Sequence, residues 1–566
     1  MRNPHEIFAD YFKGSEAIAY ILSKRLADGN ICIAVSHYDP GEAGPGENTP
    51  SAPYIVSPRE FETQLRNSPY VSEDENVLSP FIRKGDNLYL HRYYTYESRI
   101  LNHLAAFDKS DSSPQEERLE AFENACEKFP HLFDGNDACQ LQAARSTFLY
   151  PFSIITGGPG TGKTTTIARI MLLLLGVRPG IRIGLAAPTG KAAARMNESL
   201  TNAARVIERI PDQLRETLRN LKALTIHKLL GTYPNKTTFR HHAGNPLPYD
   251  LIVIDESSMI DVALMSKLLE ATAFGCHVIL LGDKDQLASV EAGSIFGDLC
   301  QSAQTPLLKG RVTELLKSHR FDPDKGIGLL SRSVISGNRD ALSGREHVFG
   351  EVIFDYGYQT ELLEKYALLY RNYICEEDIS RALRKMNDVR ILCAVRESDK
   401  GVYAVNRLIE SLLRNSCAGF NPEKEFYHNR PVMITRNDYI LDLRNGDVGI
   451  IREVTERGGK SMYAFFEGSE PDRIRKIPAS LLPDHETVFA MTIHKSQGSE
   501  FDKVVVILPD ENAGRKILSR ELFYTAITRA KTGVLVQSSP QTLDACFQKC
   551  VTRSSGIMQR LADLSK

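Results

Sequence analysis

The sequence lacks a strong net charge of either sign and lacks paired cysteines. Its 566 residues carry a formal net charge of −2, so any binding to nucleic acid must come from locally placed basic residues. The ten cysteines are scattered without a CxxC pair, and only Cys546 and Cys550 lie close together. Cysteines scattered along a large chain usually serve as small buried apolar residues in a reducing cytosol. This pattern argues against a disulfide framework or a zinc site.

The sequence also lacks a long hydrophobic run, a short-period repeat and a low-complexity tract. No stretch reaches transmembrane length, and the first residues contain no apolar signal region, so we expect a cytoplasmic protein with no membrane partner. Hydrophobic content of 42% and charged content of 25% are ordinary for a globular protein. A chain of this length is too long to fold around one hydrophobic core and should form three or four domains.

A glycine-rich segment stands between an apolar run at 152–156 and a helical pattern that begins with Ile167 and Ile170. Strand, loop and helix in this order are the context that a phosphate-binding P-loop requires, and the match to its pattern is complete. The alternative is that the glycine-rich segment is only a structural turn and binds no phosphate. Inward backbone N–H groups and a helix N-terminus favour phosphate, so we expect a nucleoside triphosphate to bind here. The expected binding residues are Gly157, Gly158, Pro159, Gly160, Thr161, Gly162, Lys163, Thr164 and Thr165.

Two adjacent acids follow the fully apolar run at 251–254. We expect Asp255, with the Thr164 hydroxyl, to hold Mg²⁺, and Glu256 to orient or deprotonate the attacking water. Lys163 would contribute a charge on the β- and γ-phosphates. Two acids at a strand end can instead form a helix N-cap. Together with the P-loop upstream, they favour hydrolysis of the triphosphate.

The rest of the chain divides into segments of different pattern. In residues 1–115, a helix near 18–26 precedes a strand at 31–35, a loop at 39–53, an aromatic strand at 87–96 and a linker at 109–114. His91 and Arg92 among the tyrosines suggest either nucleic-acid stacking or, more simply, a packed aromatic strand.

Apolar strands alternate with helical patterns in two further segments, about 116–330 and 331–566, which indicates α/β units with parallel sheets. Residues about 430–485 differ, with Asn445-Gly446 as a hairpin signal, and indicate a small β-barrel inserted into the second unit. The expected strands are 152–156, 183–187, 251–254, 277–281, 391–394, 504–508 and 534–536, with a helix over 362–373.

Two α/β units with one P-loop imply a triphosphate held in the cleft between them. Gln286 follows a strand and is placed to sense the γ-phosphate, while Arg320 and Arg529 are candidates for stabilising charge on the transferring phosphoryl oxygens. An isolated arginine is more often a surface ion-pair residue. The neighbouring residues favour a role at the site instead. They are 281–293 (LGDKDQLASVEAG), 318–321 (SHRF), 491–501 and 521–531.

In order and wording, these segments resemble the motifs of superfamily 1 helicases, and most closely those of the RecD family, the α subunit of bacterial exodeoxyribonuclease V. Residues 187–193 (APTGKAA) resemble motif Ia, and Gln140 stands 17 residues before Gly157, where the family keeps an adenine-reading glutamine. The resemblance is dense over about 135–540 and looser over 1–115. The segments 241–246 and 430–449 are RecD-like beyond the general superfamily.

The resemblance implies RecA-like domains 1A (116–330) and 2A (331–566), a reduced 1B insertion at about 232–248 and an SH3-like 2B insertion at about 430–485. Residues 1–115 would be a subunit-docking domain. ATP and Mg²⁺ would be bound, and DNA would be contacted without regard to base sequence. Two of the DNA contacts, His227 and His494, are weak candidates for metal ligands, because no third ligand accompanies either. The implied DNA contacts are Pro188, Thr189, Lys191, His227, Thr492, His494 and Lys495.

The resemblance further implies an ATP-dependent 5′→3′ DNA helicase that acts on single strands and duplex ends, in a heterotrimer with RecB-like and RecC-like subunits. No carboxylate–lysine nuclease cluster follows Ala530, so we expect no cutting. A stand-alone repair helicase is one alternative, although the long N-terminal extension of such proteins is absent here. An ATP-gated subunit that clamps DNA without unwinding is the other.

Overall fold

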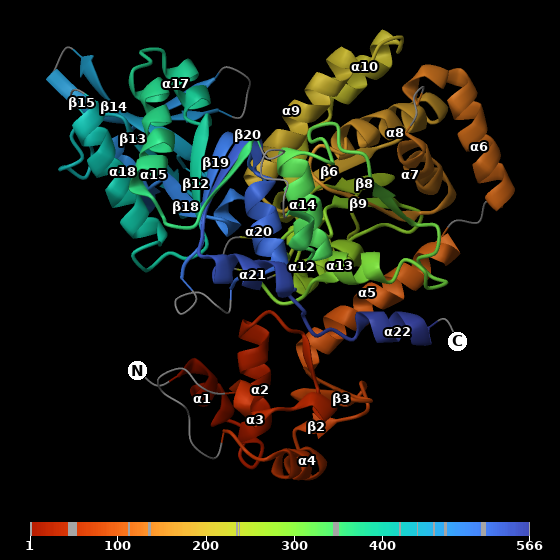
Figure 1. The fold of residues 1–566 in the computed structure, drawn as a ribbon. Helices are drawn as coiled ribbons and strands as arrows, with labels where there is room; N and C mark the ends of the chain where they lie inside the picture. Colours follow the sequence, from red (N-terminus) through yellow and green to blue (C-terminus); the bar gives the residue numbers. More distant parts are fainter. Residues whose placement is uncertain are drawn as a thin grey trace.

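The computed structural model describes most of the chain, and four sheets organise it (Figure 1). The described residues are 3–43, 54–110, 114–133, 137–233, 236, 238–342, 350–417, 420–438, 440–456, 459–468, 473–510 and 517–564.

The first large unit contains a six-stranded parallel sheet in the order β10-β5-β9-β8-β6-β7. Its central strands are mostly apolar and almost entirely buried because helices cover both faces. All four strands predicted for this unit are confirmed. The strands are β5 (Phe152–Gly157), β6 (Ile183–Ala187), β7 (Ala223–Thr225), β8 (Leu251–Ile254), β9 (His277–Gly282) and β10 (Val312–Leu315).

The second unit contains a five-stranded parallel sheet in the order β11-β20-β19-β12-β18. The two parallel sheets confirm the α/β class. The predicted helix over 362–373 is present as three consecutive helical segments, α15 (Thr360–Ala367), η6 (Leu368–Tyr370) and α16 (Arg371–Ile374). The strands are β11 (Val352–Asp355), β12 (Val389–Cys393), β18 (Ala490–Thr492), β19 (Phe501–Ile507) and β20 (Ala530–Gln537).

An antiparallel five-stranded sheet, β16-β15-β14-β13-β17, is inserted between β12 and β18 of the second unit. Its core includes Val432, Ile451 and Phe466. Asn445-Gly446 does not form a two-residue hairpin tip. It ends the longer connection between β13 and β14, where Gly446 has a φ of +92°. The strands are β13 (Arg430–Ile434), β14 (Val448–Glu456), β15 (Gly459–Glu467), β16 (Ile474–Pro478) and β17 (His485–Thr487).

The N-terminal unit is a small four-stranded sheet, β1-β4-β3-β2, with α1 (Pro4–Ala9), α2 (Glu16–Ala27) and α4 (Pro58–Asn67) against it. Its strands are β1 (Cys32–Ala34), β2 (Val71–Ser72), β3 (Phe81–Lys84) and β4 (Asn87–Leu90). The loop predicted at 39–53 begins instead with a short helix, α3 (Pro40–Ala43), and its remainder lies outside the described residues.

The predicted strand over 87–96 is wrong beyond Leu90, because α5 (His91–Ser110) begins at His91. The Nε group of Arg92 donates to the Tyr96 hydroxyl at 2.7 Å, an i,i+4 pair that a helix allows and a strand does not. The apolar side of α5 packs on α12 (Val262–Glu270) and shares the core of the six-stranded unit, although α5 lies before the border predicted near 115. Residues 111–113 of the predicted linker lie outside the described residues.

The C-terminal segment leaves the second unit after α21 (Pro540–Gln548) and crosses to the first (Figure 1). Its helix α22 (Ile557–Asp563) packs on α5 and α13 (Ile295–Gln301). Among the helices of the described ranges, none has both the length and the apolar character needed to cross a bilayer.

Candidate nucleotide-binding cleft

The P-loop turns between β5 and α8 (Lys163–Val177) at the carboxyl edge of the six-stranded sheet. Gly160 and Gly162 have φ values of +78° and +83°, in the left-handed region that glycine adopts without strain. A side chain at Gly160 would also meet the Cβ of Arg320 at 2.4 Å. The Lys163 ammonium donates to the carbonyls of Gly157 at 2.6 Å and Gly158 at 3.2 Å. The lysine charge therefore lies over the loop that would hold the phosphates.

Asp255 and Glu256 lie directly after β8, facing the P-loop. Burial and the charge of Glu256 raise the pKa of Asp255 to about 6, against the opposing effects of Lys163 and Arg195. Glu256 has a φ of +51°, a conformation that costs energy for a residue with a side chain and is common at functional sites. Glu256 precedes the short helix η3 (Ser257–Met259) but makes no side-chain capping hydrogen bond. The capping alternative therefore has no support from this geometry.

The loop after β9 is held by the second unit. Gln286 donates through Nε2 to the Asp283 carboxylate at 2.8 Å, and the Tyr524 hydroxyl of α20 (Arg520–Ile527) donates to the same oxygen at 3.1 Å. The backbone N–H of Leu287 donates to Thr525 Oγ1 at 2.9 Å. Burial raises the pKa of Asp283. A shift of α20 would therefore be transmitted to Gln286.

Both predicted arginines line the cleft. Arg320 pairs with Glu500 at 2.8 Å, and Arg195, which the sequence analysis did not identify, pairs with the same carboxylate oxygen at 2.8 Å. Burial alone would raise the pKa of Glu500, but the two arginines outweigh it and lower that pKa to about 2. Arg529 is buried, where it donates to the carbonyls of Thr525 at 3.1 Å and Ser499 at 3.3 Å.

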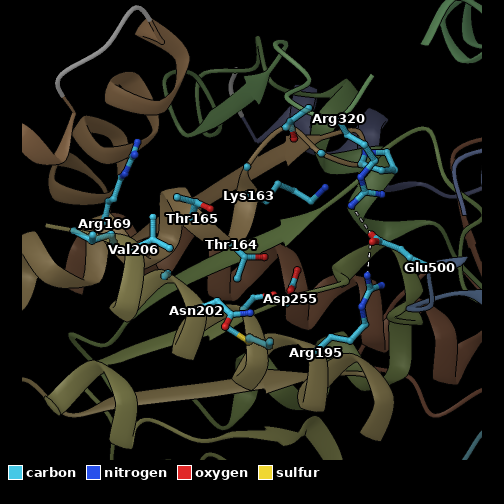
Figure 2. Close-up of a pocket in the computed structure, with 18 of the residues that line it drawn as sticks. Lys163, Thr164, Thr165, Arg169, Arg195, Asn202, Val206, Asp255, Arg320 and Glu500 are labelled. Carbon is cyan, nitrogen blue, oxygen red and sulfur yellow. Dashed lines mark hydrogen bonds and ion pairs between the residues drawn. The ribbon is translucent and has the colours of Figure 1, made fainter. Parts of the chain in front are cut away.

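These side chains line one cleft of about 720 Å³ (Figure 2). Figure 2 shows Glu500 between Arg320 and Arg195 at one end, and Arg169 and Val206 toward the other. Both α/β units contribute to the lining, as the sequence predicted. From the P-loop, its lining includes Pro159, Gly160, Thr161, Gly162, Lys163, Thr164 and Thr165, and from elsewhere Arg195, Asp255, Glu256, Gln286, Arg320, Glu500 and Arg529.

Gln140 is buried near the N-terminus of α7 (Ala138–Leu149) and is not among the residues lining the cleft. Its Oε1 accepts a hydrogen bond from Arg169 Nη1 at 2.9 Å, and Arg169 does line the cleft. Arg169 was not predicted from the sequence because it lies on α8 beyond the P-loop pattern. The adenine-reading role of Gln140 stays a prediction.

The predicted DNA contacts of the first unit follow the carboxyl ends of β6 and β7. Thr189 accepts a hydrogen bond from the backbone of Ala192 and so caps α9 (Gly190–Val206), directly after Pro188. Lys191 is half-buried; burial, Arg390 and Arg195 lower its pKa to about 8. His227 on α11 (Ile226–Leu230) packs against Phe239, with ring centroids 5.7 Å apart.

The predicted DNA contacts of the second unit lie at the end of β18 and on η8 (His494–Ser496). Thr492 accepts a hydrogen bond from the backbone of Lys495, whose ammonium pairs with Glu486 at 2.8 Å. Burial, with the charge of Arg553, lowers the pKa of His494. Within the described ranges, no group of three or more acidic, histidine or cysteine residues is arranged to hold a metal ion.

The two units touch at residues that are close in sequence to both sets of predicted DNA contacts. Gly498, in the loop after η8, lies against Ala192 at the start of α9, with its Cβ position 3.7 Å from the alanine Cβ. Arg444, in the connection between β13 and β14, lies against Gly190. The carboxyl ends of both parallel sheets therefore contribute to one region beside the nucleotide cleft.

Comparison with known proteins is consistent with this geometry. A family described as AAA domain matches residues 140–292, and one described as UvrD-like helicase C-terminal domain matches residues 487–536. The chain is 29% identical to the ATP-dependent RecD2 DNA helicase of Deinococcus radiodurans, over 72% of this chain and 50% of that protein.

Two relatives named RecBCD enzyme subunit RecD match nearly the whole chain. The protein from Mycolicibacterium smegmatis is 35% identical over 98% of this chain and 95% of its own length. The protein from Haemophilus influenzae is 32% identical over 97% of this chain and 93% of its own length. Similarity of this extent, over all the units described above, shows that the chain belongs to the RecD family.

Proposed function

We propose that the chain is an ATP-dependent DNA helicase motor that moves 5′→3′ as the RecD-type subunit of a RecBCD-like complex processing duplex ends. The observation that carries the proposal is a cleft that both α/β units line. The first unit contributes Lys163, Asp255 and Glu256, and the second contributes Glu500 and Arg529. A nucleotide held by both units can change their relative position when it is hydrolysed.

The residues present fit Mg²⁺. Asp255 is a half-buried carboxylate that lines the cleft. Its pKa is raised by burial and by the neighbouring Glu256, so a cation beside it would relieve that repulsion. Its oxygens and the Thr164 hydroxyl are ligands of the kind that Mg²⁺ prefers. When bound, Mg²⁺ would neutralise charge on the phosphate oxygens.

The other residues have separate roles in this proposal. Lys163 exchanges its two loop carbonyls for phosphate oxygens, and Glu256 accepts a proton from the attacking water. Arg320 and Arg529 stabilise charge on the phosphoryl group, and Gln286 senses its loss. The hydrogen bonds from Tyr524 to Asp283 and from Leu287 to Thr525 carry that change to the second unit.

DNA would lie across the region where Pro188, Thr189, Lys191 and His227 approach Thr492, His494 and Lys495. Closure and opening of the cleft would move the Lys191 side relative to the His494 side along the strand. The inserted sheet would act as the SH3-like 2B domain, residues 232–248 as the reduced 1B element, and the N-terminal unit as the docking domain for a RecC-like subunit. The 5′→3′ direction rests on family membership alone.

The proposal is tested on the full chain by ATP hydrolysis with and without single-stranded DNA. We expect DNA to stimulate hydrolysis severalfold or more. A stand-alone helicase would purify from native lysate without companions, whereas the proposed subunit should co-purify with RecB-like and RecC-like proteins. An ATP-gated clamp would bind DNA in an ATP-dependent manner without unwinding it.

A further inference from the structure

Glu500 holds two arginines that come from different parts of the chain. Its Oε1 atom lies 2.8 Å from Arg195 Nη2 and 2.8 Å from Arg320 Nη2. Arg195 lies on α9 of the first unit, Arg320 follows β10, and Glu500 precedes β19 of the second unit. One carboxylate oxygen therefore bridges two guanidinium groups across the junction of the units, as Figure 2 shows.

This cluster lies inside the nucleotide cleft. The three side chains line it together with Lys163, and each is partly exposed, at 34% for Arg195, 24% for Arg320 and 18% for Glu500. Arg195 is also close enough to Asp255 for its charge to lower the pKa of that carboxyl. Arg195 is thus within electrostatic reach of the carboxylate proposed to hold the nucleotide's metal ion.

The cluster leaves bonding capacity unused. The Nη1 nitrogen of Arg320 is buried and has no hydrogen-bond partner among the described residues. A buried guanidinium nitrogen without a partner is costly, and it is satisfied when an anion enters. Guanidinium groups bind phosphate oxygens in the same paired geometry that they use for carboxylates.

We propose that Arg195 is a third arginine of the nucleotide site, and that Glu500 holds Arg195 and Arg320 in the absence of nucleotide where the terminal phosphate of ATP engages them. The proposal rests on the proposed function and adds a residue to its site. The Glu500 carboxylate and the terminal phosphate then compete for the same two arginines. Because Glu500 belongs to the second unit, this competition also exchanges an ion pair between units for contacts to the nucleotide.

The test is the affinity of the full chain for a fluorescent non-hydrolysable ATP analogue and for fluorescent ADP, with Mg²⁺ and without DNA. Arg195→Gln should weaken binding of the analogue about tenfold, the loss of one charge-assisted hydrogen bond, and should change ADP binding less than about threefold. Arg195→Lys should recover part of the loss. Glu500→Gln should strengthen binding of the analogue, because the competing carboxylate charge is gone. The double variant should bind it more weakly than Glu500→Gln, because Arg195 is missing, and more tightly than Arg195→Gln, because Arg320 is released.

Arg205→Gln is the matched control, since Arg205 is an exposed arginine on the same helix and does not line the cleft. It should leave both affinities unchanged, and each variant should keep the wild-type circular dichroism spectrum. If Arg195 serves only to join the units, Arg195→Gln and Glu500→Gln will shift both nucleotides in the same direction, which overturns the proposal. A wild-type chain that binds neither nucleotide would instead contradict the proposed function, so the two failures are distinguishable.

Discussion

The Lys163 ammonium is held by two backbone carbonyls of its own loop, so it is positioned before any phosphate arrives. Its bonds are local, and α8 is anchored by a buried apolar face that includes Ile167, Ile170 and Met171. The charge of Lys163 is therefore needed for binding phosphate and contributes little to the packing of the helix.

Lys163→Ala should reduce DNA-stimulated ATP hydrolysis to background while the thermal unfolding midpoint changes by no more than a few degrees, because one partly exposed loop charge contributes little stability. Phosphate release measured with and without single-stranded DNA checks this. Lys222→Ala, at an exposed lysine outside the cleft, is the control. Wild-type activity in the Lys163 variant would refute the P-loop assignment.

Glu256→Gln should still bind ATP but hydrolyse it about 100-fold or more slowly, because the amide cannot accept a proton from water. DNA should then remain bound in the ATP-bound state. Nucleotide affinity and single-turnover hydrolysis, measured separately, check the retained binding and the slowed hydrolysis. A collapse of nucleotide binding would mean that Glu256 is a metal ligand and that the roles given to Asp255 and Glu256 are reversed.

The residues that the sequence predicted for the cleft belong to short contiguous segments with a known order, which is why Lys163, Asp255, Glu256, Gln286, Arg320 and Arg529 were found. Arg195 and Arg169 stand on helices, where an arginine is an ordinary surface residue. Arg195 is held in the cleft by Glu500, and Arg169 contacts Gln140. Both contacts join segments that are distant in the sequence, so no local pattern reveals them.

At the scale of single elements, continuous apolar runs predicted the buried parallel strands correctly, because both faces of each sheet are covered. The strand predicted over 87–96 was too long because a short strand passes directly into a helix there, and aromatic residues are buried in both. No local pattern predicted the C-terminal crossing.

The crossing segment packs against a buried carboxylate of α5. Gly556 donates its backbone N–H to Glu97 of α5 at 3.0 Å, and Arg560 of α22 lies 3.6 Å from the same carboxylate. Burial raises the pKa of Glu97 to about 7, although Gly556 and Arg560 act in the opposite direction. The folded state therefore binds a proton at Glu97 between about pH 4.5 and pH 7, where the unfolded state does not.

Glu97→Gln should remove a pH dependence of stability. The proton on Glu97 stabilises the wild type below about pH 4.5, and this contribution is lost as the pH rises through 7, by at most about 3 kcal/mol. The unfolding midpoint of Glu97→Gln should thus rise relative to the wild type by several degrees between pH 5 and pH 8. Glu120→Gln, at an exposed glutamate of α6 (Gln115–Lys128), should show no such trend. If the unfolding midpoints of the wild type and of Glu97→Gln change equally with pH, burial does not raise the pKa of Glu97.

At the scale of the whole molecule, a net charge of −2 gives no general attraction to DNA, so the proposed binding depends on locally placed basic residues. Two lysines among the proposed contacts, Lys191 and Lys495, would displace counterions from a single strand. Affinity should fall about sevenfold or more between 50 and 200 mM salt, and Lys495→Ala should lower the logarithmic slope by about 0.7. Fluorescence anisotropy with a labelled oligonucleotide measures the affinity at each salt concentration and hence the slope. A slope of zero would contradict binding through contacts to the phosphates.

The central claim is that one cleft between two α/β units drives movement along DNA. The most direct measurement is unwinding of a duplex with a single-stranded tail on one side only, by the purified full chain with ATP and Mg²⁺ and with Lys163→Ala as the control. We expect ATP-dependent unwinding from the 5′ tail alone, with both strands uncut. Unwinding from the 3′ tail would contradict the RecD-type direction, and strand cleavage would contradict the absence of a nuclease site. Vigorous DNA-stimulated ATP hydrolysis without unwinding from either tail would contradict the central claim.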